Sequence, residues 1–405
     1  MRRLLFAVIP TLLLCACSEE ESKTEMRANG ETLAQKFIIA DSHIDLPDRL
    51  RGKWEDVTQA TPNGNFDYPR ARQGGLDAPF MSIYVPTSYE AHGAKVFADE
   101  RIDSVETLIA AAPDKFAPAY NVEAVRLNTA AGLISMPMGM ENGAPIEGDL
   151  ANLQHFYDRG IRYITLAHSE ANHIAESSFD EDRPWGGLSE FGFTVIEEMN
   201  RLGIMVDVSH ISDAAFEDVM AISEAPVIAS HSSARHFTPG FERNMSDEMI
   251  IKMTASGGVI NINASSLFLT PDGSSYLFPY LQALGAFLEE HGVSSDSDEA
   301  HAFINEYMTT HPFPYASLDD IIIHIEHVIS IAGVDHVGIG SDFEGAGDTF
   351  PKGFKDVSYY PALIDGLLAR GYSEADIEKI MGGNLLRVWS EVEAYARTQS
   401  EASAR

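Results

Sequence analysis

Eight short apolar runs recur along this 405-residue chain, and longer segments with helical patterning separate them. Most runs are nearly continuous in apolar residues, as expected of parallel strands that are buried on both faces. The segments between them are long enough for crossover helices, and no Gly-rich phosphate turn of an open doubly wound sheet follows the first run. The pattern therefore predicts a (β/α)₈ TIM barrel. The predicted strands are residues 37–43, 78–86, 133–141, 162–168, 204–210, 226–231, 258–262 and 336–342.

Six of the eight predicted strands end in a histidine or a carboxylate. Because the C-terminal ends of barrel strands share one rim, these side chains are expected to form one ring. Chance accounts easily for one or two such endings, but it does not comfortably account for six. The six residues are His43, Glu141, His168, His210, His231 and Asp342, and Asp45 follows just beyond the first strand.

This rim can supply the ligands of a binuclear metal centre. Two ions about 4 Å apart need a bridging group and separate ligands for each ion. His43 and Asp45 can hold one ion, His210 and His231 the other, and Glu141 has two oxygens with which to bridge them. Nitrogen and oxygen donors with open positions suit zinc, although manganese, cobalt or iron fit the same donors. Metal-bound water ionises near pH ~7, so the two ions would provide a bridging hydroxide as nucleophile.

Ordinary structural roles compete with these interpretations. Asp45 can cap the following helix, and histidines such as His210 and His231 are often satisfied by core hydrogen bonds. Asp342 can likewise cap a helix, whereas a catalytic Asp342 would act as general base and then general acid. His168 is the one strand-end histidine that is not assigned as a metal ligand, and it is suited to donate a hydrogen bond to a developing oxyanion.

The N-terminal residues predict an export signal. Residues 1–16 combine two arginines, a short apolar run and small residues, and Cys17 stands where a bacterial lipoprotein is lipidated. Residues 17–29 then form a polar tether, and the protein is expected to be lipid-anchored in the cell envelope, facing the periplasm. The alternative is a plain cleaved signal. Cys15 and Cys17 are the only cysteines, so no disulfide is expected within the mature fold.

The rest of the chain, residues 30–395, is predicted to be one barrel domain with a polar tail at 396–405. Residues 264–318 interrupt the rhythm of strands and helices with aromatic runs, and an insertion there would lie over the mouth of the barrel as a lid or interface. Acidic side chains number 61 against 28 basic ones, which gives a net charge of −33 and makes nucleic acid a poor partner.

From about residue 33 to 392 the chain resembles the membrane dipeptidases, also called renal dipeptidases, of the amidohydrolase superfamily. The motifs that carry the resemblance, in order, are DSHIDLP, GMENG, ITLAHSEAN, PWGGLSEFG, VDVSH, SHSSAR, ERNMSDE, GIGSDFEG and GGNLLRVW. The resemblance implies zinc ligands at His43, Asp45, Glu141, His210 and His231, a substrate-polarising His168 and a catalytic Asp342. It also implies that Arg243 binds the free carboxylate of the substrate, whereas the residues alone would favour a surface ion pair for this arginine.

The resemblance thus implies a zinc-dependent dipeptidase with two zinc ions, tolerance for a D-residue at the C-terminal position, and a homodimer. The loop after His168 and residues 264–318 depart from the family pattern, and both bear on substrate preference. One rival is another amide or lactone hydrolase, for instance an N-acyl amino acid deacylase. A second rival is a non-catalytic binding lipoprotein, for which a missing ligand would be expected, and none is missing.

Overall fold

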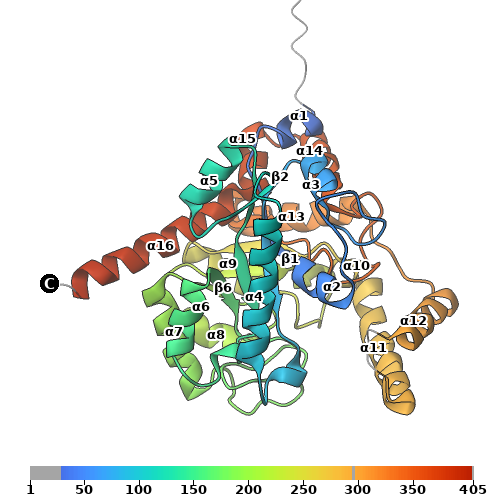
Figure 1. The fold of residues 1–405 in the computed structure, drawn as a ribbon, viewed down its shortest axis with the longest axis horizontal. Helices are drawn as coiled ribbons and strands as arrows, with labels where there is room; N and C mark the ends of the chain where they lie inside the picture. The colour runs from blue at the N-terminus through green and yellow to red at the C-terminus, as the bar shows by residue number, and fades with distance from the viewer. Residues whose placement is uncertain (1–28, 294–296, 404–405) are drawn as a thin grey trace, which may run out of the picture.

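The computed structural model describes residues 29–293 and 297–403 and shows a closed barrel of parallel strands with helices around it (Figure 1). Around the barrel the strands follow the order β1, β10, β9, β8, β7, β6, β5, β2, so the first and last strands in the chain pair and close the sheet. The barrel strands are β1 (Ile39–Ile44), β2 (Leu76–Tyr84), β5 (Met138–Glu141), β6 (Ile161–Thr165), β7 (Met205–Asp207), β8 (Ile228–Ser232), β9 (Val259–Ile262) and β10 (Val337–Ile339). The predicted (β/α)₈ barrel is confirmed.

Each of the eight predicted strands corresponds to a barrel strand, with one division. The predicted strand 133–141 is split at Pro137 into β4 (Ile134–Met136) and β5, and β4 pairs with β3 (Phe116–Pro118) in a separate two-stranded sheet. Proline has no N–H group with which to continue the hydrogen-bond ladder, which explains the break. The strands before His168, His210 and Asp342 end three residues earlier than predicted, so these three side chains lie on the loops at the rim.

Helices surround the barrel, and several begin with a serine cap. Ser189, Ser212 and Ser246 each accept a hydrogen bond from a backbone N–H in the first turn of the helix that follows. The helices are α1 (Gly30–Ala34), α2 (Leu46–Gly52), α3 (Tyr68–Gly74), α4 (Ala94–Ala111), α5 (Val122–Ala130), α6 (Ala151–Asp158), α7 (Glu190–Leu202), α8 (Asp213–Ile222), α9 (Asp247–Ala255), α10 (Ser266–Leu269), α11 (Pro271–His291), α12 (Asp298–Thr310), α13 (Leu318–Ala332), α14 (Tyr360–Ala369), α15 (Glu374–Glu378) and α16 (Asn384–Ser403).

The segment 264–318 forms α10 and a helical hairpin of α11 and α12 that stands out from the barrel (Figure 1). It follows β9, the seventh strand of the barrel. At the other end of the chain, residues of the predicted polar tail as far as Ser403 continue α16, which extends beyond the barrel. Asn384 side-chain hydrogen bonds to the carbonyls of Val334 and Val337 hold the start of this helix to the barrel.

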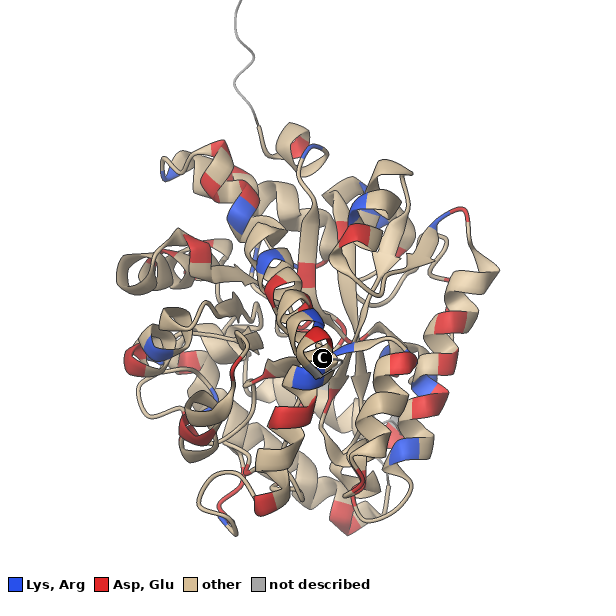
Figure 2. Ribbon diagram, turned by 90° about the vertical axis from the view of Figure 1, so that its left-hand side faces the viewer, with Lys and Arg blue, Asp and Glu red and all other residues tan. Residues whose placement is uncertain are grey.

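The predicted signal peptide, Cys17 and nearly all of the tether lie outside the described residues. Within residues 29–293 and 297–403, none of the helices has both the length and the apolar character needed to cross a bilayer. Aspartate and glutamate residues are distributed over many helices and loops rather than confined to one segment (Figure 2).

Candidate metal centre

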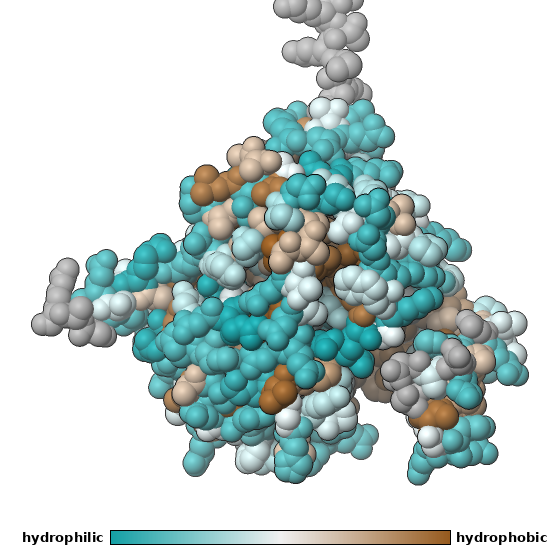
Figure 3. All heavy atoms as spheres, viewed as in Figure 1, coloured by the Kyte–Doolittle hydropathy of each residue, from teal (hydrophilic) through white to brown (hydrophobic). Residues whose placement is uncertain are grey.

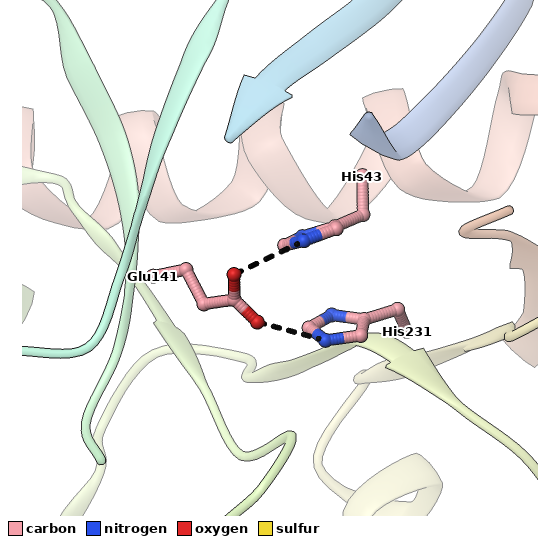
Figure 4. A group of neighbouring side chains, drawn as sticks. All are labelled: His43, Glu141 and His231. Carbon is pink, nitrogen blue, oxygen red and sulfur yellow. Dashed lines mark ion pairs between the residues drawn. The ribbon is translucent and has the colours of Figure 1, made fainter. Parts of the chain in front are cut away.

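Glu141, the last residue of β5, lies at the centre of a buried cluster of histidines. Its Oε1 atom is 3.2 Å from Nε2 of His210 and 3.2 Å from Nε2 of His231, and its Oε2 atom is 3.5 Å from Nε2 of His43. Figure 4 shows His43 and His231 directed at different oxygens of this carboxylate. Each oxygen of one carboxylate therefore faces an imidazole from a separate strand, as in a bridging ligand.

A hydrogen-bond chain behind His231 decides where its proton lies. The Ser230 hydroxyl donates to Oδ2 of Asp207 at 2.5 Å, so it accepts from Nδ1 of His231, 2.7 Å away. The Nε2 atom of His231 then presents a lone pair to the centre of the site. Supporting hydrogen bonds of this kind orient the histidine ligands of metals.

His210 and His231 face each other as neutral imidazoles. Their Nε2 atoms are 2.8 Å apart, and burial holds the pKa of both rings well below the ordinary value. Nδ1 of His210 is buried without a hydrogen-bond partner in the described part of the chain. Two neutral rings that converge on a carboxylate through their Nε2 atoms form a donor set for a cation.

His43 contributes a third converging nitrogen, from β1. Its Nδ1 atom is 2.8 Å from the Tyr163 hydroxyl, and its Nε2 atom is 3.4 Å from Oδ2 of Asp45. This Nε2 atom is fully buried and has no hydrogen-bond partner among residues 29–293 and 297–403. A buried nitrogen without a hydrogen-bond partner destabilises the fold unless a bound ligand satisfies it. A metal ion facing Asp45 and Glu141 would do so.

The buried carboxylates of the site repel one another, which favours a bound cation. Burial, together with the neighbouring carboxylate of Asp45, raises the pKa of Asp342 to about 8, and burial raises the pKa of Asp45 as well. Divalent cations would offset this repulsion. Within the described residues, three overlapping groups have ligand atoms within 4.8 Å of one another: His43, Glu141 and His231; Glu141, His168 and His210; and His43, Asp45 and Asp342. The residues present fit a metal centre, and the second group shows that His168 also lies within ligand distance.

Asp342 is held at the rim by a strained backbone. Its φ is 65°, in the left-handed region, and Nδ2 of Asn263 donates to its Oδ2 atom at 2.9 Å. The backbone of His210 lies in the same left-handed region, with φ 71°. A side chain at Gly345 would collide with the carboxylates of Asp45 and Asp342, so only glycine allows the loop to pass this close.

Arg243 reaches the same site from the loop after β8. Its guanidinium donates 2.8 Å hydrogen bonds to the Ser232 hydroxyl and to the His231 carbonyl, and the side chain is buried. Burial lowers the pKa of Arg243 to about 10, so the group remains charged at neutral pH. Its Nε has no hydrogen-bond partner, and no ion pair involves this guanidinium in the described part of the chain. A buried cation without a paired carboxylate is prepared to receive an anion.

A cavity of about 900 Å³ joins these groups to solvent. Its floor is polar and its outer wall is aromatic, with α11 and α12 supplying part of that wall. The predicted site residues that line it are Asp45, Glu141, His168, His210, His231, Arg243 and Asp342, while His43 lies buried behind them.

Sequence reasoning missed four supporting residues. Tyr84 ends β2 and packs its ring 4.8 Å from that of His168, and Asn263 follows β9. These are the two strands to which no site residue was assigned. Asn263 directly follows the predicted strand 258–262, so strand-end position could have found it, whereas Tyr84 lies two residues before the end of the predicted strand 78–86. Tyr163 lies within β6 and Asp207 is the last residue of β7. Both lie inside the predicted strands 162–168 and 204–210, so neither carried a strand-end signal.

The fold and the donor set define a barrel metallohydrolase. Comparison with known families narrows this class. The family model of the membrane dipeptidases, peptidase family M19, matches residues 27–403. The chain therefore belongs to the membrane dipeptidase family, and it is a metallodipeptidase-type hydrolase.

Known proteins agree with this assignment. Dipeptidase aclJ of Aspergillus oryzae is 34% identical over 84% of this chain and 72% of its own length. Dipeptidase 3 of Mus musculus is 31% identical over 92% of this chain and 68% of its own length. The crystal structure of the probable dipeptidase PvdM from Pseudomonas aeruginosa superposes with a TM-score of 0.77 at 29% identity, covering 91% of this chain and 98% of that one.

A further solved structure contains a ligand. The metallopeptidase from Rhodobacter sphaeroides, liganded with a phosphinate mimic of the dipeptide L-Ala-D-Ala, superposes with a TM-score of 0.71 at 27% identity. The superposition covers 88% of this chain and 99% of the Rhodobacter sphaeroides chain.

Proposed function

We propose that this protein is a zinc-dependent dipeptidase that hydrolyses the peptide bond of free dipeptides and accepts a D-residue at the C-terminal position. One observation carries the proposal: the buried guanidinium of Arg243, which forms no ion pair with the described residues, shares a cavity with the converging His and carboxylate donors. The first group suits a free carboxylate, and the second suits metal ions that act on a peptide bond.

Two zinc ions would be held by His43 and Asp45 on one side and by His210 and His231 on the other, with Glu141 between them. Bound there, they would supply a water molecule that ionises near neutral pH and would polarise the carbonyl of the substrate. Manganese, cobalt and iron fit the same ligands, so the choice of zinc rests on the nitrogen-rich donor set.

Arg243 would bind the substrate carboxylate through the N–H groups that Ser232 and His231 leave free. This contact fixes the C-terminal end of the dipeptide and places its peptide bond over Glu141 and His168. The anchor therefore selects the peptide bond that precedes a free C-terminal residue, which in a dipeptide is the only peptide bond.

His168 and Asp342 would carry the proton chemistry. Burial lowers the pKa of His168, and its Nδ1 atom is 2.6 Å from the Ser169 hydroxyl. A neutral His168 whose Nε2–H faces the cavity can donate to the oxygen on which charge develops. Asp342 would take the proton of the attacking water and return it to the leaving amine.

Tolerance of a D-residue is supported by the Rhodobacter sphaeroides metallopeptidase, which is liganded with a mimic of L-Ala-D-Ala. The cavity of about 900 Å³ would leave room for a side chain of either hand beside the Arg243 anchor. Cell-wall dipeptides would then be among the substrates.

The deciding experiment uses residues 18–405, which omit Cys17, and measures amino-acid release from L,L and L,D dipeptides before chelation, after it and after zinc is restored. Zinc-restored cleavage is the expected result, and the ratio of L,D to L,L rates reports the stereochemical preference. If a protein shown to hold two metals cleaved no dipeptide, the dipeptidase proposal would fail. An N-acyl amino acid deacylase or lactonase would then be the better reading.

We further propose that the full chain is lipidated at Cys17, faces the periplasm and acts as a homodimer. The support is the lipoprotein-like sequence before Cys17 and the family resemblance. Cys17→Ser should move the protein from the membrane fraction to the soluble fraction, and sedimentation velocity of residues 18–405 should give twice the monomer mass. If Cys17→Ser stayed in the membrane fraction, lipidation at Cys17 would be rejected. A monomer mass would reject the homodimer.

A further inference from the structure

A second cluster of metal-binding side chains lies outside the cavity. It consists of His236 in the 3₁₀ turn Arg235–Phe237, Asp247 at the start of α9, and His327 in α13. Each residue offers a ligand atom, and these atoms lie within 4.8 Å of one another. Three segments of the chain therefore converge on one point with two imidazoles and a carboxylate.

The contacts within the cluster are close. Nε2 of His327 is 2.7 Å from Oδ1 of Asp247, and the rings of His236 and His327 stack with centroids 4.3 Å apart and planes inclined by 25°. Phe237 packs edge-on against His327 and covers one side. Within residues 29–293 and 297–403, no hydrogen bond engages the ring of His236.

An ordinary ion pair does not account for this arrangement. His155 makes such a pair with Asp99 at 2.8 Å, but Lys95 and Arg159 also neutralise that carboxylate. Asp247 has no lysine or arginine within ion-pair distance in the described part of the chain. Instead, the imidazole of His236 stacks on that of His327. Among the described residues, the cluster therefore has two imidazoles and the carboxylate of Asp247, and no lysine or arginine pairs with this carboxylate.

We propose that His236, Asp247 and His327 form a peripheral binding site for a divalent transition-metal ion of the zinc class. Two imidazoles and one carboxylate give the nitrogen and oxygen donor set that zinc accepts, with solvent completing a tetrahedron. The site is reachable, because His236 is exposed and His327 and Asp247 are partly exposed. The net charge of −33 raises the local concentration of cations at such a surface.

An ion at this site would tie the loop after β8 to α9 and α13. That loop already closes on itself, since Nε of Arg235 donates to the Asn244 carbonyl at 2.6 Å and the Met245 N–H donates to the Ser233 carbonyl at 2.9 Å. It also carries Arg243. The peripheral ion would thus brace the segment that presents the substrate anchor, without itself touching the cavity.

The test compares zinc content in the wild-type protein and in the His236→Ala and Asp247→Asn variants. All are equilibrated with the same excess of free zinc, and bound zinc per chain is measured by equilibrium dialysis with elemental analysis. Each variant is expected to bind one zinc ion fewer than wild type and to retain dipeptidase activity. Free zinc should raise the thermal midpoint of wild type further than that of either variant.

His155→Ala is the matched control, because it removes a His–Asp pair that lacks a second histidine. Its zinc content should equal that of wild type. Equal zinc content in all four proteins would overturn the proposal. An equal loss in His155→Ala would also overturn it, because it would show non-specific binding to surface histidines.

Discussion

Asp342 shows how much of the candidate chemistry depends on single residues. A left-handed backbone turns it over the rim, Asn263 fixes one oxygen, and the absence of a side chain at Gly345 leaves room for its carboxylate. A strained φ persists only where the surrounding structure holds it, and such strain clusters at functional sites. These constraints favour a functional carboxylate over a helix cap.

Asp342→Asn should lower kcat by about 10²- to 10⁴-fold, because the amide cannot take up and return the proton. Bound metal should stay near the wild-type content, because the amide oxygen occupies the same position. Steady-state kinetics together with elemental analysis measures both. Asp348→Asn is the matched control, since Asp348 lines the same cavity but pairs with Lys355 and Tyr315. Wild-type kcat in Asp342→Asn would refute the proton-transfer role.

Arg243→Met should raise KM for dipeptides by about 10- to 100-fold, the value of one or two charge-assisted hydrogen bonds. The same substitution should leave cleavage of the corresponding dipeptide amides almost unchanged, because an amide offers no carboxylate to bind. The comparison of acid and amide substrates is the measurement. Equal losses on both substrates would mean that Arg243 acts through the fold, by way of Ser232 and His231, rather than through the carboxylate.

At the scale of elements, the hairpin of α11 and α12 sets the shape of the cavity. Phe278 and Leu281 on α11 are 52% and 45% exposed, and both line the cavity. Phe278 also packs edge-on against Phe179 and Phe241. Phe179 continues the aromatic wall down to the ring of His210. The surface is hollowed between the barrel and this hairpin (Figure 3). The insertion therefore offers an apolar surface to whatever side chain extends from the metal centre.

Phe278→Ala and Leu281→Ala should raise KM roughly 3- to 10-fold for dipeptides with a large apolar side chain and leave small dipeptides unaffected. Stability should fall by no more than about 1.5 kcal/mol, since both side chains are about half exposed and Phe278 also makes edge-on ring contacts. Kinetics on a series of dipeptides of increasing side-chain size gives the answer. Val96→Ala is the control, because Val96 is 63% exposed on α4 outside the cavity. A uniform effect across the series would exclude a specificity role for the hairpin.

At the scale of the whole molecule, the barrel tolerates a costly charge at its base. Asp77 in β2 accepts a hydrogen bond from the Ile39 N–H at 3.2 Å, and burial raises its pKa from 3.8 to about 6. Because the folded pKa exceeds the unfolded one, the stability associated with this group is present below pH 3.8 and is lost as the pH rises through about 6.

Asp77→Asn should therefore stabilise the protein near neutral pH by about 2 to 3 kcal/mol, with the amide oxygen retaining the hydrogen bond from Ile39. The gain should disappear near pH ~3, below the unfolded pKa, where both states of wild type hold the proton. Thermal midpoints of wild type and variant at the two pH values test this. Asp77 also lies 3.9 Å from the guanidinium of Arg72, and the loss of this ion pair opposes the stabilisation. A lower thermal midpoint for Asp77→Asn than for wild type at neutral pH would show that the ion pair outweighs the cost of burying the charge.

Much of the architecture was predictable because its signals are local. Continuous apolar runs report burial on both faces, and a barrel places every strand end on one rim, so residue type and position along the chain were enough to nominate His43, Glu141, His210 and His231. Pro137 interrupted one predicted strand, and its missing N–H was a local signal of the division as well. The strand ends at His168, His210 and Asp342 were predicted less well, because the turn that follows each strand is set by contacts with neighbouring loops.

The sequence by itself determined the barrel, the family and the residue types on its rim. The tertiary structure decided which atoms face one another, since those contacts join residues far apart in the chain. Tyr163 lies 120 positions from His43, whose Nδ1 it meets, and Asn263 lies 79 positions from Asp342. It also decided that Arg243 is buried and unpaired instead of forming a surface ion pair, and that His236, Asp247 and His327 converge. Such pairings depend on how strands and loops pack, and no periodicity in the chain encodes them.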